Sequence, residues 1–382
     1  MGKQYISTVS ASNAHDLDIL GLEITNKYTI TVSSDGYAKF WDNSQDELQD
    51  PNSLVKQYLI EKMGIHHVAS YQNILPNSNI RIVILAFGCF DGTIRLKYYI
   101  NDDLDSLQDV KCPELGSSTY WCPSFYKDPE SRQDYFVVTQ ASGNVSVLNL
   151  NISAAEEKIS ILLERHGNLG TEEMSFPNSL AVSKTSSKKV AVGYTNGDVL
   201  LYDLTTLKPI YTFPSTDLQS STKSSSSIAR ALEFSPGGRL LAVSRDNQSA
   251  GSITLYDVDY GENVGSLTTA SHSAKTAIGG FAHEGWIMGL SFNEEGNMLA
   301  SGGFDKCVRI WDLDSREREA TIQISVSDLE NPNENDMDNS IVSGVKFIKK
   351  NIRGGLGGDK NDGICIISFD RGVRWYREAG GI

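Results

Sequence analysis

Residue types that could carry chemistry are few in this chain, and their spacing forms no recognised reactive group. The five cysteines are odd in number and contain no Cys-x-x-Cys pair; they are Cys89, Cys112, Cys122, Cys307 and Cys365. A zinc site needs clustered ligands, and a disulfide framework needs paired cysteines. We therefore expect free thiols in a reducing compartment, and no metal.

The six histidines include one adjacent pair, His66 and His67, without the spacing of a zinc-binding helix. Neighbouring residues of a strand point to opposite faces of a sheet. This pair is therefore not expected to bind one metal ion.

Catalytic motifs are also missing. The chain has no Gly-x-Ser-x-Gly elbow, and the glycine-rich string at 353–360 lacks the Gly-Lys-[Ser/Thr] ending of a phosphate-binding loop. We interpret that string as a flexible loop between two strands. Most carboxylates lie in loops or turns, where aspartate is a structural residue. We expect a protein that is not an enzyme and has no cofactor.

The charge balance argues against nucleic acid. Lysine and arginine number 34 against 48 acidic residues, for a net charge of −14, whereas binding to a phosphate backbone depends on basic side chains. The basic residues around Lys346 and Lys350 are interpreted as a solvated strand face. No apolar run is long enough for a membrane span, and no targeting pattern is visible. We expect a cytoplasmic protein, with the nucleus as an alternative.

One phrase recurs along the chain: an alternating apolar run, a turn, a second run, then an aromatic residue and often aspartate. Five clear copies lie at 31–42, 85–99, 190–203, 299–312 and 366–376, and two weaker ones at 137–150 and 241–257. Steps of about 50–60 residues exceed the usual length of such repeats. We assign the excess to loops at 43–52, 101–114, 151–173, 220–227 and 328–338.

Alternation with period two and Asp-Gly or Asn-Gly turns predict short strands joined by tight hairpins, about four per repeat. Seven four-stranded units predict an all-β, seven-bladed β-propeller. We expect a single domain over residues 1–382. The strand-like run 4–10 belongs to no repeat and is predicted to pair with the last unit, closing the ring.

Trp-Asp at 41–42 and 311–312, with Ala-His at 14–15 and 282–283, resembles the WD-repeat family. In that family the histidine binds the turn aspartate. The resemblance therefore implies a His15–Asp35 pair in the first unit and a His283–Asp305 pair in the sixth. The other five units lack part of this pattern.

Segments outside the repeat pattern, at 251–267, 281–293, 345–357 and 374–381, are similar to the WD-repeat subunit of the fungal superkiller complex, whose animal counterpart is WD-repeat protein 61. The resemblance implies a non-catalytic subunit beside a tetratricopeptide-repeat scaffold and a DExH-box RNA helicase, which assist the exosome in mRNA decay. Fungal members also act in meiotic recombination beside a topoisomerase-like DNA-cleaving protein. The alternative is an adaptor of another nuclear transcription or signalling complex.

Three columns of equivalent positions are expected on the top face of the ring. The column at the channel mouth includes Leu20, Trp121, Arg230, Met288 and Ser343, with His66 and Asn178 as further members. A second column, two residues earlier, includes Asp18 and Trp286. A third, before the second hairpin turn, includes Phe90, Phe304 and Phe369.

These columns are rich in apolar and aromatic residues, and an exposed apolar patch indicates an interaction site. We predict a peptide-binding top face on units one, six and seven, anchored by Trp286, Phe304 and Phe369. Trp121 and Phe90 extend it, and Asp18 would accept an arginine of the partner. The alternatives are that each aromatic packs into a neighbouring blade, and that Asp18 binds a loop amide.

Overall fold

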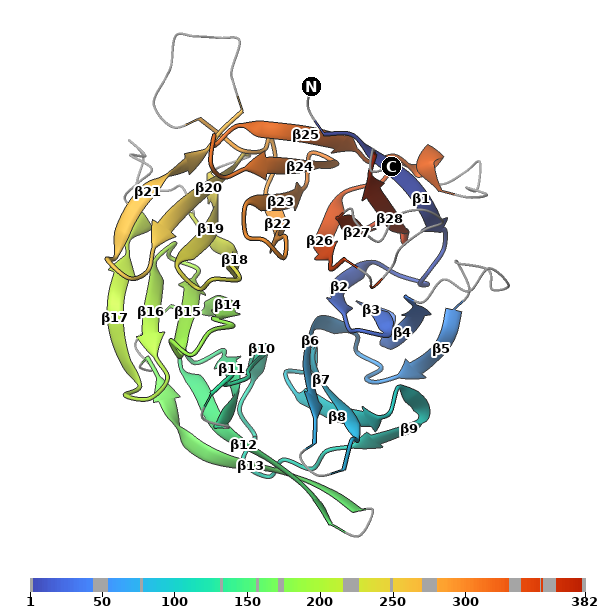
Figure 1. The fold of residues 1–382 in the computed structure, drawn as a ribbon, viewed down its shortest axis with the longest axis vertical. Helices are drawn as coiled ribbons and strands as arrows, with labels where there is room; N and C mark the ends of the chain where they lie inside the picture. Colours follow the sequence, from blue (N-terminus) through green and yellow to red (C-terminus); the bar gives the residue numbers. More distant parts are fainter. Residues whose placement is uncertain are drawn as a thin grey trace.

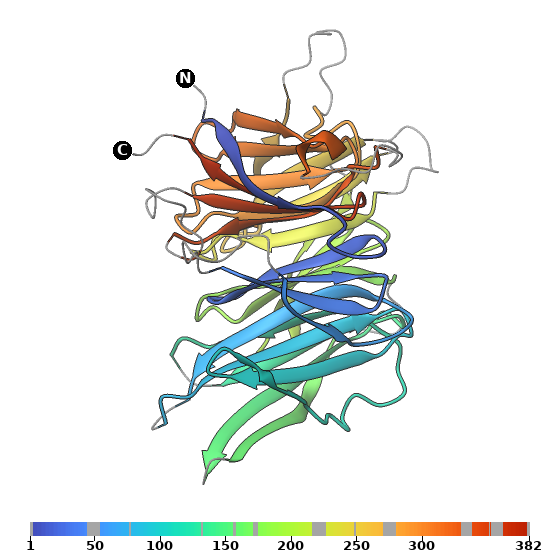
Figure 2. The same cartoon turned by 90° about the vertical axis from the view of Figure 1, so that its right-hand side faces the viewer.

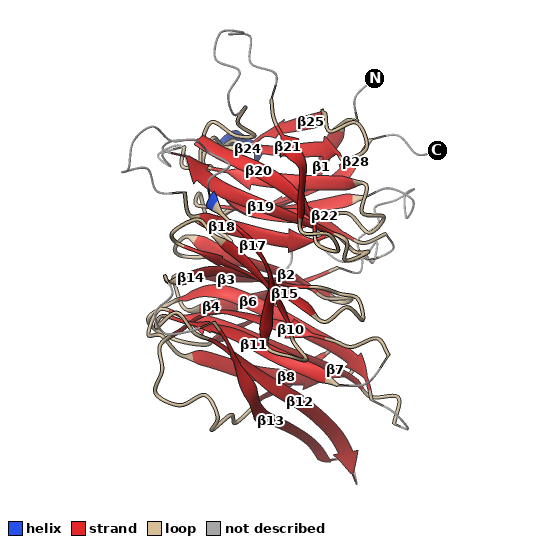
Figure 3. Cartoon of the chain, turned by 90° about the vertical axis from the view of Figure 1, so that its left-hand side faces the viewer, coloured by secondary structure: helices blue, strands red, loops and turns tan. Residues whose placement is uncertain are grey.

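The computed structural model describes residues 3–43, 54–75, 78–130, 133–155, 158–170, 175–215, 227–247, 250–269, 280–329, 338–350, 352 and 362–379. Within these ranges the strands form seven antiparallel four-stranded sheets, arranged as blades around a central channel (Figure 1). Strands make up nearly all of the regular structure (Figure 3). The predicted all-β, seven-bladed propeller is confirmed. That residues 1–382 form one domain stays a prediction.

The first three blades follow each other around the ring. Blade 1 contains β2 (Ile19–Ile24), β3 (Tyr28–Ser33), β4 (Tyr37–Asp42) and β5 (Leu54–Leu59). Blade 2 contains β6 (Ile65–Ile74), β7 (Arg81–Cys89), β8 (Ile94–Ile100) and β9 (Asp103–Asp109). Blade 3 contains β10 (Tyr120–Tyr126), β11 (Asp134–Gln140), β12 (Val145–Ala155) and β13 (Lys158–Leu169).

The other four blades complete the ring. Blade 4 contains β14 (Pro177–Val182), β15 (Lys189–Tyr194), β16 (Val199–Asp203) and β17 (Lys208–Phe213). Blade 5 contains β18 (Ala229–Phe234), β19 (Leu240–Asn247), β20 (Ala250–Asp257) and β21 (Glu262–Leu267). Blade 6 contains β22 (Ile287–Phe292), β23 (Met298–Gly303), β24 (Cys307–Asp312) and β25 (Arg318–Gln323). Blade 7 contains β26 (Val342–Ile348), β27 (Gly363–Ser368), β28 (Val373–Glu378) and, at its outer edge, β1 (Tyr5–Ala11). A short 3-10 helix, η2 (Val326–Asp328), precedes blade 7.

The ring closes where β1 pairs antiparallel with β28, from Tyr5 opposite Glu378 to Ala11 opposite Val373. Figure 2 shows the blue first strand lying along the red last strands. The closing strand that the sequence predicts is thus confirmed. Val9 and Ala11 pack into the core beside Trp41 and Trp375, so closure buries apolar side chains as well as a strand edge.

The core consists of apolar side chains packed between neighbouring sheets. Between blades 1 and 2, for example, Tyr28 of β3 packs edge-on against Tyr99 of β8, with ring centroids 6.1 Å apart. Tight turns connect the strands, and Gly36, Gly92 and Gly197 adopt positive φ there, which a side chain would strain. Each blade therefore has two buried faces and presents its turns at the two ends of the ring.

Two predicted loops are strands instead. The segment 101–114 contains β9, and 151–173 contains the end of β12 and the whole of β13. The β12–β13 hairpin extends beyond the ring (Figure 1). Ile152, Ile159 and Ile161 of that hairpin pack against the core between blades 2 and 3. These apolar residues alternate within a mostly polar segment, so the sequence did not indicate a strand there. Most of 43–52, 220–227 and 328–338, and the glycine-rich string 353–360, lie outside the described residues.

Within the part of the chain that the structure describes, no helix is long and apolar enough to cross a membrane. The same part holds no group of three or more histidine, cysteine, aspartate or glutamate side chains placed to bind a metal ion.

Closure by β1 predicts an asymmetry within that strand. Val9 is 7% exposed and faces Trp375, whereas Ile6 is 46% exposed. Replacing Val9 with Asp would bury an unpaired charge and should lower the free energy of unfolding by about 3 kcal/mol. The matched control Ile6→Asp should change it little. Equal effects in urea unfolding would contradict closure through this face of β1.

Candidate functional site

Buried polar networks support the top turns of blades 1 and 6. In blade 1, His15 Nδ1 lies 2.9 Å from Asp35 Oδ2 and its Nε2 lies 2.9 Å from Thr31 Oγ1, to which Trp41 Nε1 donates at 3.0 Å. Blade 6 repeats this arrangement. His283 Nδ1 contacts Asp305, its Nε2 contacts Ser301 Oγ, and Trp311 Nε1 donates to the same Ser301 hydroxyl. The two histidine–aspartate pairs implied by the WD-repeat resemblance are confirmed.

The electrostatics of these networks favour a neutral imidazole facing a carboxylate. Burial lowers the pKa of His15 and of His283, and this effect outweighs the opposing attraction of the aspartates. Burial alone would raise the pKa of Asp35, but its hydrogen bond to His15 and two backbone amides lower it overall. The turns are therefore held by fully hydrogen-bonded groups, as buried polar atoms require.

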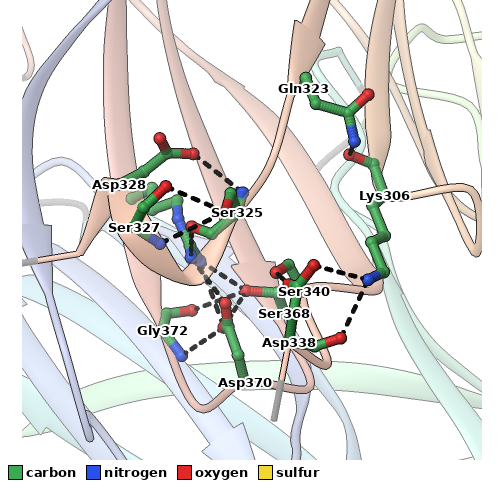
Figure 4. A network of polar contacts seen from close by, with 11 residues as sticks. Lys306, Gln323, Ser325, Ser327, Asp328, Asp338, Ser340, Ser368, Asp370 and Gly372 are labelled. Atoms are coloured by element: carbon green, nitrogen blue, oxygen red, sulfur yellow. Dashed lines mark hydrogen bonds and ion pairs between the residues drawn. The ribbon is translucent and has the colours of Figure 1, made fainter. Parts of the chain in front are cut away.

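Blade 7 holds its turn with a different set of residues. Arg374, which is fully buried, donates to Ser368 Oγ at 2.7 Å, to Asp370 Oδ2 at 2.6 Å and to the Ser325 carbonyl at 2.8 Å. Figure 4 shows Ser325, Ser368 and Asp370 converging there. Nearby, Lys306 of blade 6 donates to Asp338 Oδ2 at 2.8 Å, in the segment that leads into β26. These bonds fix the turns of blades 6 and 7 relative to each other.

A backbone hydrogen bond repeats at the top of all seven blades. In six blades, the amide of the residue that follows the second strand donates to the carbonyl of a residue just before the first strand. In blade 5, the donor is the amide of Asp246, near the end of the second strand. The donor–acceptor pairs are Ser34–Asp18, Phe90–Gly64, Ala141–Thr119, Thr195–Phe176, Asp246–Ile228, Phe304–Trp286 and Phe369–Ile341, at 2.8–3.1 Å. The second and third predicted columns are therefore neighbours in space, blade by blade.

The first strand of every blade also has a β-bulge near its start. A bulge leaves an extra residue outside the ladder and redirects its side chain. The residues at these bulges are Leu20, His66, Trp121, Asn178, Arg230, Met288 and Ser343, which is the first predicted column. Leu20, His66, Arg230, Met288 and Ser343 line the central channel.

Three of the predicted anchors form one aromatic cluster. The Trp286 ring lies 5.2 Å from that of Phe304, which meets Phe369 edge-on at 6.0 Å. The Arg230 guanidinium lies 4.9 Å from the centre of the Trp286 ring. Trp286 is 37% exposed, and Phe304 and Phe369 are half-buried. We call these four residues the Trp286 cluster; it joins blades 5, 6 and 7.

Phe90 and Trp121 belong to a second cluster, on blades 2, 3 and 4. His66 stacks on Trp121 with centroids 3.9 Å apart and contacts Phe90 at 5.0 Å, while Phe176 meets Trp121 edge-on at 5.5 Å. Phe90 is 46% exposed. These four residues, together with His67, form the Trp121 cluster. Leu20 and Met288 line the channel that both clusters border.

The sequence-based placement of His66 and His67 on opposite faces is wrong. Their Nδ1 atoms lie 2.6 Å apart, because the bulge at His66 breaks the alternation between adjacent side chains. One ring donates and the other accepts. Burial lowers the pKa of His66 to about 4 and that of His67 to about 3, so both are neutral near pH 7.

Asp18 is exposed on blade 1, next to the turn that holds Phe369. Its carbonyl accepts from the Ser34 amide at 3.1 Å. Burial raises the pKa of its carboxyl, and the charge of Arg371 partly opposes that rise. The carboxylate is therefore near one cation of the chain already. Its role toward a partner's arginine, like the roles of the other predicted site residues, stays a prediction.

The sequence reasoning missed one charged member of the top face. Asp246, near the end of β19, makes in blade 5 the backbone hydrogen bond that Phe304 and Phe369 make in blades 6 and 7. Its carboxylate accepts hydrogen bonds from Nε and from a terminal nitrogen of Arg230. An insertion near 245–251 hid the alignment of this repeat, although counting from the preceding apolar strand could have found it.

Comparisons with known proteins agree with this architecture. Residues 276–312 match the family model described as WD domain, G-beta repeat. Antiviral protein SKI8 of Saccharomyces cerevisiae is 33% identical over 402 residues, an alignment that covers 100% of both chains. The chain belongs to the SKI8 family. The resemblance to WD-repeat subunits of superkiller complexes is thereby confirmed.

Two further relatives share only one repeat with this SKI8-family chain. Periodic tryptophan protein 2 homolog of Schizosaccharomyces pombe is 62% identical over 34 residues, which are 9% of this chain and 4% of that protein. Protein tipD of Dictyostelium discoideum is 45% identical over 40 residues, 10% of this chain and 6% of that protein. Each of these matches covers a tenth of this chain or less.

The buried histidines of this SKI8-family protein predict acid sensitivity. An unfolded histidine titrates near pH 6.5, whereas His66 titrates near pH 4, so the unfolded state binds more protons between these values. The free energy of unfolding should therefore decrease as the pH is lowered through this window. For one such group the decrease should reach about 2 kcal/mol at pH 5. Urea unfolding at pH 7 and pH 5 should show a smaller loss for His66→Asn. An identical loss in both proteins would contradict a neutral, buried His66.

Proposed function

We propose that the chain is a non-catalytic, protein-binding subunit of a superkiller complex, and that its top face holds a tetratricopeptide-repeat scaffold subunit. A DExH-box RNA helicase would belong to the same assembly, which assists the exosome in 3′–5′ mRNA decay. The observation that carries this proposal is the full-length match to SKI8. We place the protein in the cytoplasm, with the nucleus as a second location.

The Trp286 cluster supports a protein partner at this face. An aromatic ring that is held in place yet partly exposed can transfer apolar area from water to a partner at little entropic cost. Tryptophan is over-represented among residues that dominate binding energy. In the turns beneath the cluster, His283 is hydrogen-bonded to Asp305 and Arg374 to Ser368, so these side chains already have partners within the chain.

The partner would meet this cluster together with Asp18 and the channel mouth. Asp18 lies beside the turn of Phe369, and an arginine of the partner could pair with it in competition with Arg371. A segment with an arginine and bulky apolar residues would satisfy both features. The same face is proposed for a topoisomerase-like meiotic partner, which capture from meiotic cells would reveal.

Affinity capture tests the proposal directly. The wild-type chain should retain the scaffold and helicase subunits, and a Trp286→Ala, Phe304→Ala variant should bind the scaffold at least about tenfold more weakly, because two anchors are lost. The matched control is Tyr260→Ala: Tyr260 is 68% exposed at the β20–β21 turn, at the opposite end of its blade.

Two results would contradict the proposal in different ways. Unchanged scaffold capture by the double variant would remove the top face as the docking surface. Capture of a different assembly by the wild-type chain, without scaffold or helicase, would favour the adaptor alternative. Circular dichroism of each variant separates lost contacts from lost folding.

We also expect no direct binding of RNA. Lys346 pairs with Glu23 at 2.5 Å and Lys350 with Glu295 at 2.6 Å, so these cations are already neutralised within the chain. Titration of the isolated protein with single-stranded RNA at low salt should give no shift. Salt-dependent binding that Lys346→Ala and Lys350→Ala abolish would contradict this expectation.

A further inference from the structure

The Arg230–Asp246 ion pair lies against the Trp286 ring and joins a partly exposed arginine to a buried aspartate. The Asp246 side chain is 2% exposed. Arg230 Nε lies 3.1 and 3.0 Å from its two carboxylate oxygens, and a terminal nitrogen lies 2.5 Å from Oδ2. Such a fork fixes the orientation of the guanidinium as well as its position.

Both residues reach this position through the backbone features of the fold. Arg230 is the bulge residue of β18, so its side chain leaves the ladder at the channel mouth. The Asp246 amide donates to the Ile228 carbonyl at 3.1 Å, which places its carboxylate beside Arg230. In the other six blades the equivalent turn residue is uncharged: Ser34, Phe90, Ala141, Thr195, Phe304 and Phe369.

The guanidinium of Arg230 in turn contacts the ring of Trp286. Trp286 is the most exposed of the predicted anchors of blades 6 and 7. The guanidinium carbon lies 4.9 Å from the centre of the Trp286 ring. The centre of the Phe304 ring lies 5.2 Å from the centre of the Trp286 ring. A continuous series of contacts therefore runs from Asp246 through Arg230 and Trp286 to Phe304.

Stability alone is a weak reason for this arrangement. A buried ion pair contributes little net stability compared with apolar residues of similar size, because desolvation of the two charges offsets their attraction. What the pair does supply is direction: it holds a cation against one aromatic ring at the surface, where the attraction orients the ring.

We propose that Asp246 and Arg230 are positioning residues of the partner-binding face, which hold Trp286 in its binding orientation. This inference rests on the proposed function of that face. Arg230 is committed to Asp246, so it orients the anchor instead of pairing with a carboxylate of the partner. The surface that Trp286 presents thus suits an apolar or aromatic side chain.

Fluorine NMR of the full chain labelled with 5-fluorotryptophan tests the positioning role. The chain has five tryptophans, and Trp286→Phe assigns the signal of interest. In Asp246→Asn the Trp286 signal should shift or broaden while the other four stay in place, and scaffold binding should weaken about fivefold, the size expected for a lost cation–π contact.

Blade 5 also supplies a matched control. At its opposite end Arg239 pairs with Asp257 at 2.8 Å, and its guanidinium lies 6.0 Å from the Tyr260 ring. Asp257→Asn removes an aspartate–arginine pair beside an aromatic ring from the same blade, with an arginine that is more exposed than Arg230. It should leave both the Trp286 signal and scaffold binding unchanged.

A second variant keeps the proposal testable if Asp246→Asn does not fold. Arg230→Met combined with Asp246→Leu replaces both charges by apolar groups of similar length, so no unpaired charge remains buried. It should shift the Trp286 signal and weaken scaffold binding about as much as Asp246→Asn does, because both variants release the ring.

An unmoved Trp286 signal in both variants would overturn the positioning role. Scaffold binding that is weakened by the double variant and left normal by Asp246→Asn would also overturn it, because it would show Arg230 to be a direct contact. If the signal moves but Trp286→Ala binds the scaffold normally, positioning is supported and the proposed docking face fails.

Discussion

The top face depends on one repeated constraint: the backbone hydrogen bond from a turn amide to the carbonyl just before the first strand of the same blade. It occurs in all seven blades at 2.8–3.1 Å. The bulge that follows adds a third residue beside the bonded pair, and in five of the blades this residue lines the channel. The backbone therefore sets where three side chains of each blade lie, and the residue types at those positions decide what the face can bind.

The two aromatic clusters show how the same backbone yields different surfaces. Around Trp286, an ion pair from blade 5 and two phenylalanines from blades 6 and 7 support an exposed indole. Around Trp121, a neutral histidine stacks on the ring and covers part of it. The first cluster presents a held but accessible anchor, whereas the second couples its packing to the protonation of His66. This contrast makes the Trp286 cluster the stronger candidate for the centre of a docking surface.

Much of this architecture could be predicted from the sequence, because alternation and Asp-Gly turns have direct backbone meaning. The seven units, the closing strand and the His15–Asp35 and His283–Asp305 pairs follow from such local patterns or from the family that they resemble. The bulges themselves could not be predicted, since a bulge has no signature residue. The contact between the adjacent side chains of His66 and His67 was therefore missed. The role of Asp246 was not predicted, because an insertion shifts the pattern of its repeat. The extended β12–β13 hairpin was not predicted, because its apolar residues alternate within a polar segment.

The central claim is that this face, rather than the opposite one, carries the partner. Photo-crosslinking in the assembled complex tests it most directly, with benzoylphenylalanine in place of Phe304 on the top face or of Tyr260 at the other end of blade 5. We predict a crosslink from position 304 to the scaffold subunit and none from position 260. A scaffold crosslink from position 260 alone would contradict it.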